Sequence, residues 1–405
     1  MAMLIGKTMD QSRLLSLSTA FSPSAPIDQR SLLAGRVSQL LDVLNVVGQK
    51  GQHAILFGER GVGKTSLARV ISRLSIGQPV TVVSVNCDPS TTFESLWRKI
   101  TKEISINLAQ RQAPGFLSEA RAQSASLDEF LPSPISPDDI RHLFGRLGKM
   151  LIVIDEMDRI KDKSTTSLMA DTIKALSDHA VDTTLLLVGV ADSVDTLISE
   201  HQSVERALMQ IQMPRMSPNE LEEIINNGFQ EAKMTATGDA RKKIVSLSQG
   251  LPHYTHLLSQ TAGQRAAMTD RTEVTAQDVR TAIDAALAKA QQSTISAYHS
   301  ATSSSRENLY PQVLLACAMA KPDNLGYFAS IDVRRPLSRI MKKAYDIPAF
   351  AQHLKAFCDP TRGPVLQRTG SARRYRFRFV NPLLQPYVLM NGIRKGLIKE
   401  TDILA

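Results

Sequence analysis

The stretch Gly58-Glu-Arg-Gly-Val-Gly63-Lys64-Thr65 decides the fold of this chain. It fits the pattern G-x-x-x-x-G-K-[ST], in which a glycine-rich loop joins a strand to a helix. An apolar run over residues 54–57 predicts the strand, and the helical pattern after the loop predicts the helix. Glycines let backbone N–H groups converge on phosphate groups, and the helix adds the positive end of its dipole. The stretch therefore predicts a site for ATP.

Each part of this loop has an expected role. Lys64 reaches the terminal phosphates, and the Thr65 hydroxyl binds Mg²⁺. ATP and Mg²⁺ are thus the expected ligands. The predicted nucleotide-binding residues are Gly58, Glu59, Arg60, Gly61, Val62, Gly63, Lys64, Thr65 and Ser66.

A second motif, Met150-Leu-Ile-Val-Ile-Asp155-Glu156, predicts a buried parallel strand that ends in two carboxylates. The carboxyl ends of such strands meet at the sheet edge where ligands of α/β folds bind. We expect Asp155 to hold the Mg²⁺ shell and Glu156 to orient and polarise the attacking water. The competing interpretation is two surface acids at a strand end. With the phosphate loop upstream, the pair favours ATP hydrolysis over binding alone.

Short apolar runs alternate with helical patterns through the first half of the chain. This alternation predicts an α/β fold with right-handed crossovers and a parallel sheet covered by helices on both faces. A stretch over residues 110–137 interrupts the rhythm and is interpreted as an insertion or long surface loop. The expected strands are residues 54–57, 80–85, 150–154, 184–190 and 210–213.

The same patterns divide the chain into five parts. Residues 1–30, rich in serine and proline, are expected to form an arm, and the polar residues 291–305 a flexible linker. At Ser217 a capping-box spacing opens a helical region. The three expected domains are an α/β nucleotide-binding domain over 31–216, a helical lid over 217–290 and a C-terminal domain over 306–405.

The composition is that of a folded globular protein. Of the 405 residues, 43% are hydrophobic and 21% are charged. Apolar runs fall short of the roughly 20 residues of a membrane helix, and the N-terminus does not read as a signal peptide. The three cysteines lack the spacing of a metal site, so a cytoplasmic location is expected.

The positive charge is concentrated near the C-terminus. The net charge is +9, of which residues 306–405 carry +10 and the first 305 residues carry −1. This asymmetry favours a C-terminal domain that faces a polyanion, and a solvated basic surface is the alternative.

Two expected strands in this region form a basic hairpin. Residues 365–368 and 373–379 flank a turn at 369–372. Period two places arginines on one face of the second strand and aromatic residues on the other. Because phosphate contacts dominate binding by such a face, we expect salt-sensitive binding to DNA. The predicted nucleic-acid-binding residues are Arg373, Arg374, Arg376 and Arg378.

The phosphate loop, the Asp-Glu strand and the appended helical region resemble the AAA+ ATPases. The whole chain is most similar to the Orc1/Cdc6-like and archaeal-ATPase branch of that family. The resemblance implies a P-loop NTPase domain, a helical lid and a C-terminal winged-helix domain. It also implies a homo-oligomer, as a ring or filament, with DNA or an effector protein as a partner.

The resemblance assigns three further positions. Asp192, beside Ser193, stands where the family commonly has a sensor Asn near the γ-phosphate, and a helix N-cap is the alternative role. Arg206 stands where the family has an arginine finger that acts on nucleotide held by the neighbouring subunit, and a surface arginine is the alternative. His253 occupies the place of an arginine that contacts the γ-phosphate in many relatives, or is a packed residue at a helix start. Asp192, Arg206 and Glu156 are therefore the catalytic candidates.

Two functions follow from these features. The first is an ATPase whose nucleotide state controls assembly and the engagement of DNA through a basic winged helix. The second is a regulatory switch similar to the STAND ATPases, which binds nucleotide persistently and signals to a protein partner. The basic hairpin favours the first function, whereas His253 and Asp192 favour the second.

Overall fold

The computed structural model describes residues 11–23, 35–74, 80–111, 127–190, 204–304, 308–371 and 374–403. Asp192, Ser193 and Arg373 lie outside the described residues, as do residues 112–126 of the expected insertion.

The nucleotide-binding unit is built on a five-stranded parallel sheet with the order β2-β3-β4-β1-β5. Strand β4 lies between β1, which leads into the phosphate loop, and β3, which ends in Asp155. The expected strands are confirmed within one or two residues at each end. Their bounds are β1 His53–Gly58, β2 Thr81–Asn86, β3 Met150–Asp155, β4 Thr183–Gly189 and β5 Leu208–Met213.

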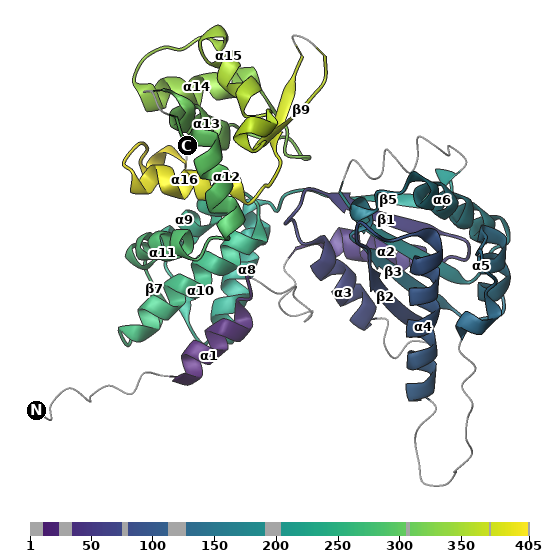
Figure 1. Ribbon diagram of the computed structural model, residues 1–405. Helices are drawn as coiled ribbons and strands as arrows, with labels where there is room; N and C mark the ends of the chain where they lie inside the picture. Colours follow the sequence, from purple (N-terminus) through teal and green to yellow (C-terminus); the bar gives the residue numbers. More distant parts are fainter. Residues whose placement is uncertain are drawn as a thin grey trace, which may run out of the picture.

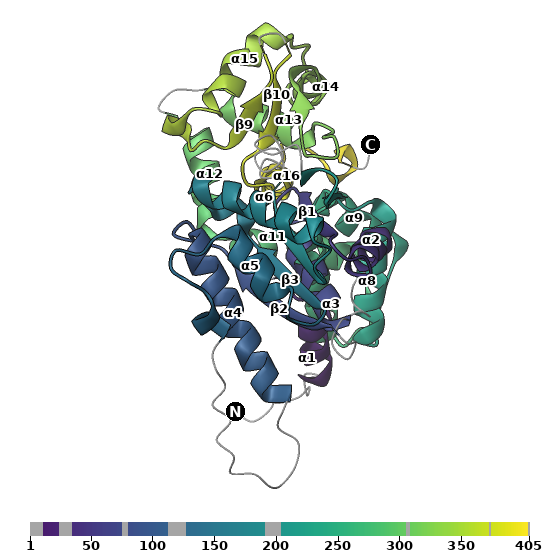
Figure 2. The same cartoon turned by 90° about the vertical axis from the view of Figure 1, so that its right-hand side faces the viewer.

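Helices cover both faces of this sheet, as the α/β alternation predicts. Successive residues of β4 point to opposite faces, so Leu185 packs against one layer of helices and Leu186 against the other. Figure 2 shows α4 and α5 on the face of the sheet that is turned toward the viewer. One layer holds α2 (Val37–Val47) and α3 (Lys64–Leu74), and the other holds α4 (Phe93–Arg111), α5 (Pro137–Phe144) and α6 (Lys163–Asp178).

The helical region after β5 begins with the capping box that its sequence predicts. The Ser217 side chain accepts a hydrogen bond from the Glu220 N–H, and the Glu220 carboxylate accepts one from the Ser217 N–H. Two short strands, β6 (Thr235–Ala236) and β7 (Glu273–Val274), pair beside the helices. The helices are α8 Pro218–Glu231, α9 Gly238–Ser248, α10 Pro252–Met268 and α11 Ala276–Ala288.

The expectation of an N-terminal arm is wrong for residues 11–21. Helix α1 (Gln11–Ala20) packs against α8 and α10, where Leu17 and Phe21 are fully buried. Two glycines make room for these side chains. A Cβ at Gly228 would stand 2.3 Å from the Phe21 ring, and one at Gly263 would stand 2.7 Å from Leu17.

The expectation of a flexible linker over 291–305 is also wrong. Helix α12 (Gln292–Thr302) fills most of this segment and buries Tyr298, whose ring meets that of Tyr387 at a centroid distance of 5.6 Å. One hydrophobic core runs from α1 through the lid into the C-terminal elements. We call the described residues of 11–23 and 217–403 together the helical body; Figure 1 shows it beside the sheet unit.

The C-terminal part of the helical body contains four helices and a small antiparallel sheet. The sheet has the order β8-β10-β9, with Phe377 of β10 opposite Arg368 of β9. Within the described residues, no helix is long and apolar enough to cross a bilayer. The elements are α13 Tyr310–Met319, β8 Phe328–Ala329, α14 Ser330–Met341, α15 Ile347–Ala356, β9 Leu366–Thr369, β10 Arg376–Phe379 and α16 Leu384–Arg394.

Candidate nucleotide-binding site

The phosphate loop leaves β1 at Gly58 and enters α3 at Lys64, as its motif predicts. Gly61 and Gly63 have φ angles of +86° and +99°, which side-chain-bearing residues rarely adopt. Val62 turns into the core beneath the loop. Glycine therefore leaves the loop backbone both bent and open to a ligand.

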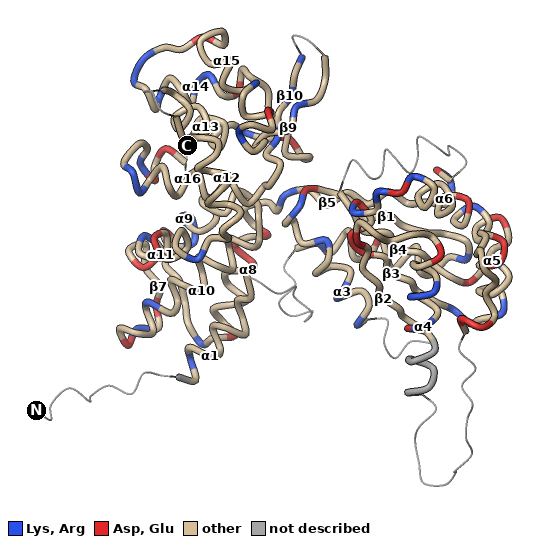
Figure 3. The backbone as a smooth tube through the Cα atoms, in the orientation of Figure 1, with Lys and Arg blue, Asp and Glu red and all other residues tan. Residues whose placement is uncertain are grey.

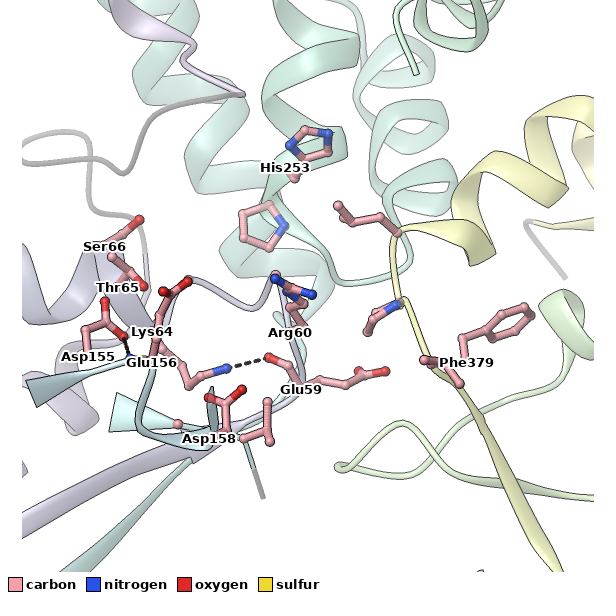
Figure 4. A pocket seen from close by; sticks show the side chains of 18 of the residues that line it. Glu59, Arg60, Lys64, Thr65, Ser66, Asp155, Glu156, Asp158, His253 and Phe379 are labelled. Atoms are coloured by element: carbon pink, nitrogen blue, oxygen red, sulfur yellow. Dashed lines mark hydrogen bonds between the residues drawn. The ribbon is translucent and has the colours of Figure 1, made fainter. Parts of the chain in front are cut away.

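Lys64 closes the loop on itself in this structure. Its Nζ donates to the carbonyl oxygens of Gly58 and Glu59 at 3.0 and 2.9 Å. Burial lowers the pKa of this amine to about 8, although Asp158 and Asp155 oppose the shift by attracting the charged form. The amine thus lies where phosphates are expected, held by loop carbonyls (Figure 4).

The two carboxylates at the end of β3 also line the cavity beside the phosphate loop. Asp155 is buried, and its side chain is hydrogen-bonded to the Thr65 hydroxyl and to the backbone N–H of Glu156. Burial raises the pKa of Asp155, and these two hydrogen bonds limit the rise. Glu156 has a φ of 58° and pairs with Arg159 at 2.8 Å. The structure therefore brings together the expected Mg²⁺ residues and the expected water-polarising residue.

Thr65 and Asp155 fit a magnesium ion. A hydroxyl and a carboxylate are hard oxygen ligands, and one or two such ligands are usual where nucleotide phosphates supply others. Among the described residues, no group of three or more His, Cys, Asp or Glu side chains could hold a metal by itself. The protein oxygens at this position therefore suit an ion that arrives with phosphates.

A cavity of about 820 Å³ lies over these residues. One wall comes from the sheet unit and includes Arg60, Lys64, Thr65, Ser66, Asp155 and Glu156, and the helical body forms the other. Figure 4 shows His253 and Phe379 on the side away from Thr65 and Asp155. The wall from the helical body includes Pro23, His253, His256, Arg378, Phe379 and Leu383.

His253 is not placed as a phosphate-binding cation. A ring nitrogen lies 2.7 Å from the carbonyl oxygen of Pro23, and burial lowers the pKa of the imidazole below its usual value. The side chain is therefore neutral near pH 7 and holds the segment after α1. This arrangement supports the alternative of a packed residue at a helix start.

Arg206 lies just before β5 and is exposed, away from the cavity of its own chain. That position is compatible with a finger that acts on another subunit and equally with a surface arginine. Its role stays a prediction.

The interpretation of one exposed arginine face on β10 is wrong at Arg378. Arg374 and Arg376 are exposed, but Arg376 pairs with Asp323 at 2.7 Å. Arg378 is only 9% exposed, donates to Gln367 and lines the cavity. Arg378 therefore borders the same cavity as the phosphate loop.

Sequence reasoning missed an ion pair that joins the phosphate loop to the helical body. Arg215, between β5 and α8, donates Nε and Nη2 to the Glu59 carboxylate at 2.6 and 2.8 Å. Its Nη1 donates to Gln385 Oε1 of α16 at 2.6 Å. These residues are far apart in sequence and follow no motif, so no local signal could have found them.

The fold and the site together define a P-loop nucleotide-binding protein. Residues 47–198, which span most of the sheet unit, match the family model described as AAA domain. No curated protein sequence matches the chain significantly.

Several solved structures are similar to this chain at low sequence identity. A Walker-type ATPase of Pyrococcus abyssi has a TM-score of 0.52 at 13% identity, covering 90% of this chain and 98% of that one. The ORC2 protein of Aeropyrum pernix, solved with ADPNP and ADP, has a TM-score of 0.49 at 14% identity, covering 94% and 98%. The ORC1 protein of Aeropyrum pernix, solved with DNA, has a TM-score of 0.45 at 16% identity, covering 95% and 98%.

Proposed function

We propose that this chain binds ATP with Mg²⁺ and hydrolyses it. The observation that supports the proposal is the convergence of Lys64, Thr65, Asp155 and Glu156 on one cavity beside the phosphate loop. These side chains come from two strands separated by a third, and the sheet edge brings them together.

Each residue has a distinct task in this proposal. Loop N–H groups and Lys64 bind the phosphates, while Thr65 and Asp155 hold the ion. Glu156 orients a water molecule and accepts its proton, and Arg159 holds that carboxylate at the cavity. A bound Mg²⁺ would withdraw charge from the phosphate oxygens and so ease attack at phosphorus.

Two substitutions test binding and chemistry separately. Lys64→Ala removes a cation from the loop, so MgATP affinity measured by titration should fall at least tenfold. Glu156→Gln keeps a similar shape but removes the proton acceptor, so MgATP should bind normally while phosphate release falls at least a hundredfold. Native affinity in folded Lys64→Ala contradicts the site, and native turnover in Glu156→Gln contradicts the role of Glu156.

The second candidate function is a nucleotide-controlled switch, and the position of the C-terminal elements supports it. Arg378, Phe379 and Leu383 line the same cavity as the phosphate loop, so nucleotide and helical body share a boundary. We infer that α13 to α15 with β8, β9 and β10 form a winged helix, because their order along the chain is that of this motif. In this function the winged helix covers the nucleotide, and its position carries the signal to a protein partner.

DNA and a homo-oligomer remain proposed partners. The net charge of +10 over residues 306–405 supports DNA, and the exposed position of Arg206 before β5 allows it to act on a neighbouring subunit. Helix α15 offers few cations for base readout, so backbone phosphates are the expected DNA contact.

A further inference from the structure

Three side chains connect the phosphate loop to the helical body; we call Glu59, Arg215 and Gln385 the relay. The Glu59 and Arg215 side chains are 3% and 10% exposed, and Gln385 is also buried. Arg215 forms a two-pronged ion pair with Glu59 and donates its remaining terminal nitrogen to Gln385 and to the Gln249 carbonyl. A guanidinium held at all three nitrogens has a fixed position.

The end of the relay in α16 is also fixed. Gln385 Nε2 donates to the Ala318 carbonyl at 2.8 Å, which turns the amide oxygen toward Arg215. The relay therefore ends in the core of the helical body, where Ala318 belongs to α13.

A second part of the helical body also packs against the Glu59 carboxylate. A Cβ at Gly326, in the turn before β8, would lie 2.2 Å from Glu59 Oε1. Glycine lets this backbone touch the phosphate loop directly. Glu59 is thus held by Arg215 on one side and by the turn on the other, and Figure 4 shows it directed away from Thr65 and Asp155.

Nucleotide binding acts on the backbone of the same residue. Lys64 Nζ donates to the carbonyl oxygens of Gly58 and Glu59 in this structure. A bound triphosphate would compete with these carbonyl oxygens for the three N–H donors of the Lys64 ammonium. Any donor that turned to a phosphate would weaken the hold on the Glu59 backbone, whose side chain is tied to the helical body.

We propose that the relay makes Arg215 a positioning residue for the phosphate loop, so that nucleotide binding and docking of the helical body oppose each other. The inference rests on the proposed nucleotide site. Separating a buried ion pair leaves uncompensated charge, so the relay has two discrete states rather than a gradual range. Because coupling between two sites is reciprocal, loosening the docked body must raise nucleotide affinity by the factor with which nucleotide loosens the body.

A matched pair of variants at Gln385 tests this coupling. Gln385→Leu and Gln385→Glu both lose the donor to the Ala318 carbonyl, but only Gln385→Glu keeps an oxygen acceptor for Arg215, now charged. We expect Gln385→Leu to raise MgATP affinity by about fivefold or more, the lower end of typical couplings. We expect Gln385→Glu to leave the affinity unchanged or lower it. A residue that only stabilises the fold would instead change affinity in the same direction in both variants.

Hydrogen exchange on the native chain provides a second readout that needs no substitution. MgATP should increase amide exchange at residues 323–327, the turn that touches Glu59. Three results would overturn the coupling. They are equal MgATP affinity in the native chain and both Gln385 variants, a shift of affinity of the same sign in both variants, and unchanged exchange at residues 323–327 in a chain that binds MgATP. A native chain that does not bind MgATP overturns the proposed function itself. The Lys64→Ala titration tests that function without reference to the relay.

Discussion

Two buried histidines make the stability of this chain sensitive to pH. His53 is fully buried in β1, and one ring nitrogen accepts a hydrogen bond from the Leu185 N–H at 3.0 Å. His256 of α10 is 4% exposed, and neither of its ring nitrogens has a hydrogen-bond partner among the described residues. Burial lowers the pKa of both side chains to about 4. Both are therefore neutral in the folded protein at pH 7.

The free energy of unfolding should fall as the pH drops from about 6.5 to 4. In this window the unfolded chain binds protons at both histidines and the folded chain does not, so each contributes a slope of up to about 1.4 kcal/mol per pH unit. His256→Leu should remove its share of the slope. It should also stabilise the protein at pH 7, because a buried polar ring without partners is replaced by an apolar side chain.

Urea unfolding at pH 7.0, 6.0 and 5.0 measures both effects. His179→Gln is the control, because it removes an exposed imidazole rather than a buried one. A slope that His256→Leu does not reduce would mean that this ring is protonated or paired in the folded protein.

At the scale of elements, α1 packs closely on α8 and α10 because each of these helices has a glycine at the contact. Phe21 and Leu17 occupy space that Gly228 of α8 and Gly263 of α10 leave empty. Phe21 also packs edge-on against Phe229, with ring centroids 5.0 Å apart, and its carbonyl accepts from Gln260. The helix thus belongs to the core of the lid.

A pair of glycine substitutions tests this packing. Gly228→Ala places a methyl group 2.3 Å from the Phe21 ring and should lower the free energy of unfolding by about 1–3 kcal/mol. Gly238→Ala in α9 meets nothing within 4 Å and should leave stability unchanged or raise it by up to about 1 kcal/mol. Thermal or urea unfolding of both variants gives the comparison, and equal stability of the two would contradict the docked position of α1.

These elements also show where sequence reasoning succeeds and fails. The phosphate loop, the strand before Asp155 and the capping box at Ser217 are local patterns, and each lies where it was predicted. Helix α1 has weak periodicity and is stabilised by glycines more than two hundred residues away, so its sequence reads as an arm. The polar segment of α12 is likewise stabilised by packing around Tyr298.

The functional site also has a part that the sequence predicts and a part that only the fold shows. Lys64, Thr65, Asp155 and Glu156 belong to two motifs whose spacing has a chemical reason, and the fold unites them. Arg215 bonds to Glu59 of the loop and to Gln385 of α16 only because the helical body folds back on the sheet unit. A contact between residues so far apart in the chain leaves no periodic pattern in the sequence.

At the scale of the whole molecule, the positive charge of the C-terminal region is divided among several surfaces. Figure 3 shows Lys and Arg on several elements of this region, including the neighbourhood of β10 and the end of α16. Arg335, Lys342 and Lys343 are exposed on or beside α14, and Arg376 is paired with Asp323 beside the turn that touches Glu59. The charge therefore serves contacts within the molecule as well as any polyanion outside it.

Substitutions of Arg374, just before β10, and of Arg378 in β10 should affect DNA binding and nucleotide binding separately, although sequence analysis placed both arginines on one DNA-binding face. Arg374→Gln removes an exposed charge, so DNA affinity should fall for all sequences, and the slope of log affinity against log salt should shrink by about 0.9 if one duplex phosphate is lost. Arg378→Gln removes a positive charge that lines the nucleotide cavity and attracts phosphates, so MgATP affinity should fall even though docking through Glu59 opposes binding, and the DNA salt slope should stay native. Fluorescence anisotropy with duplex DNA at two salt concentrations, together with MgATP titration, measures both variants. If Arg378→Gln instead weakened DNA binding as much as Arg374→Gln and left MgATP affinity native, β10 would present one nucleic-acid face, and the cavity would not include its last arginine.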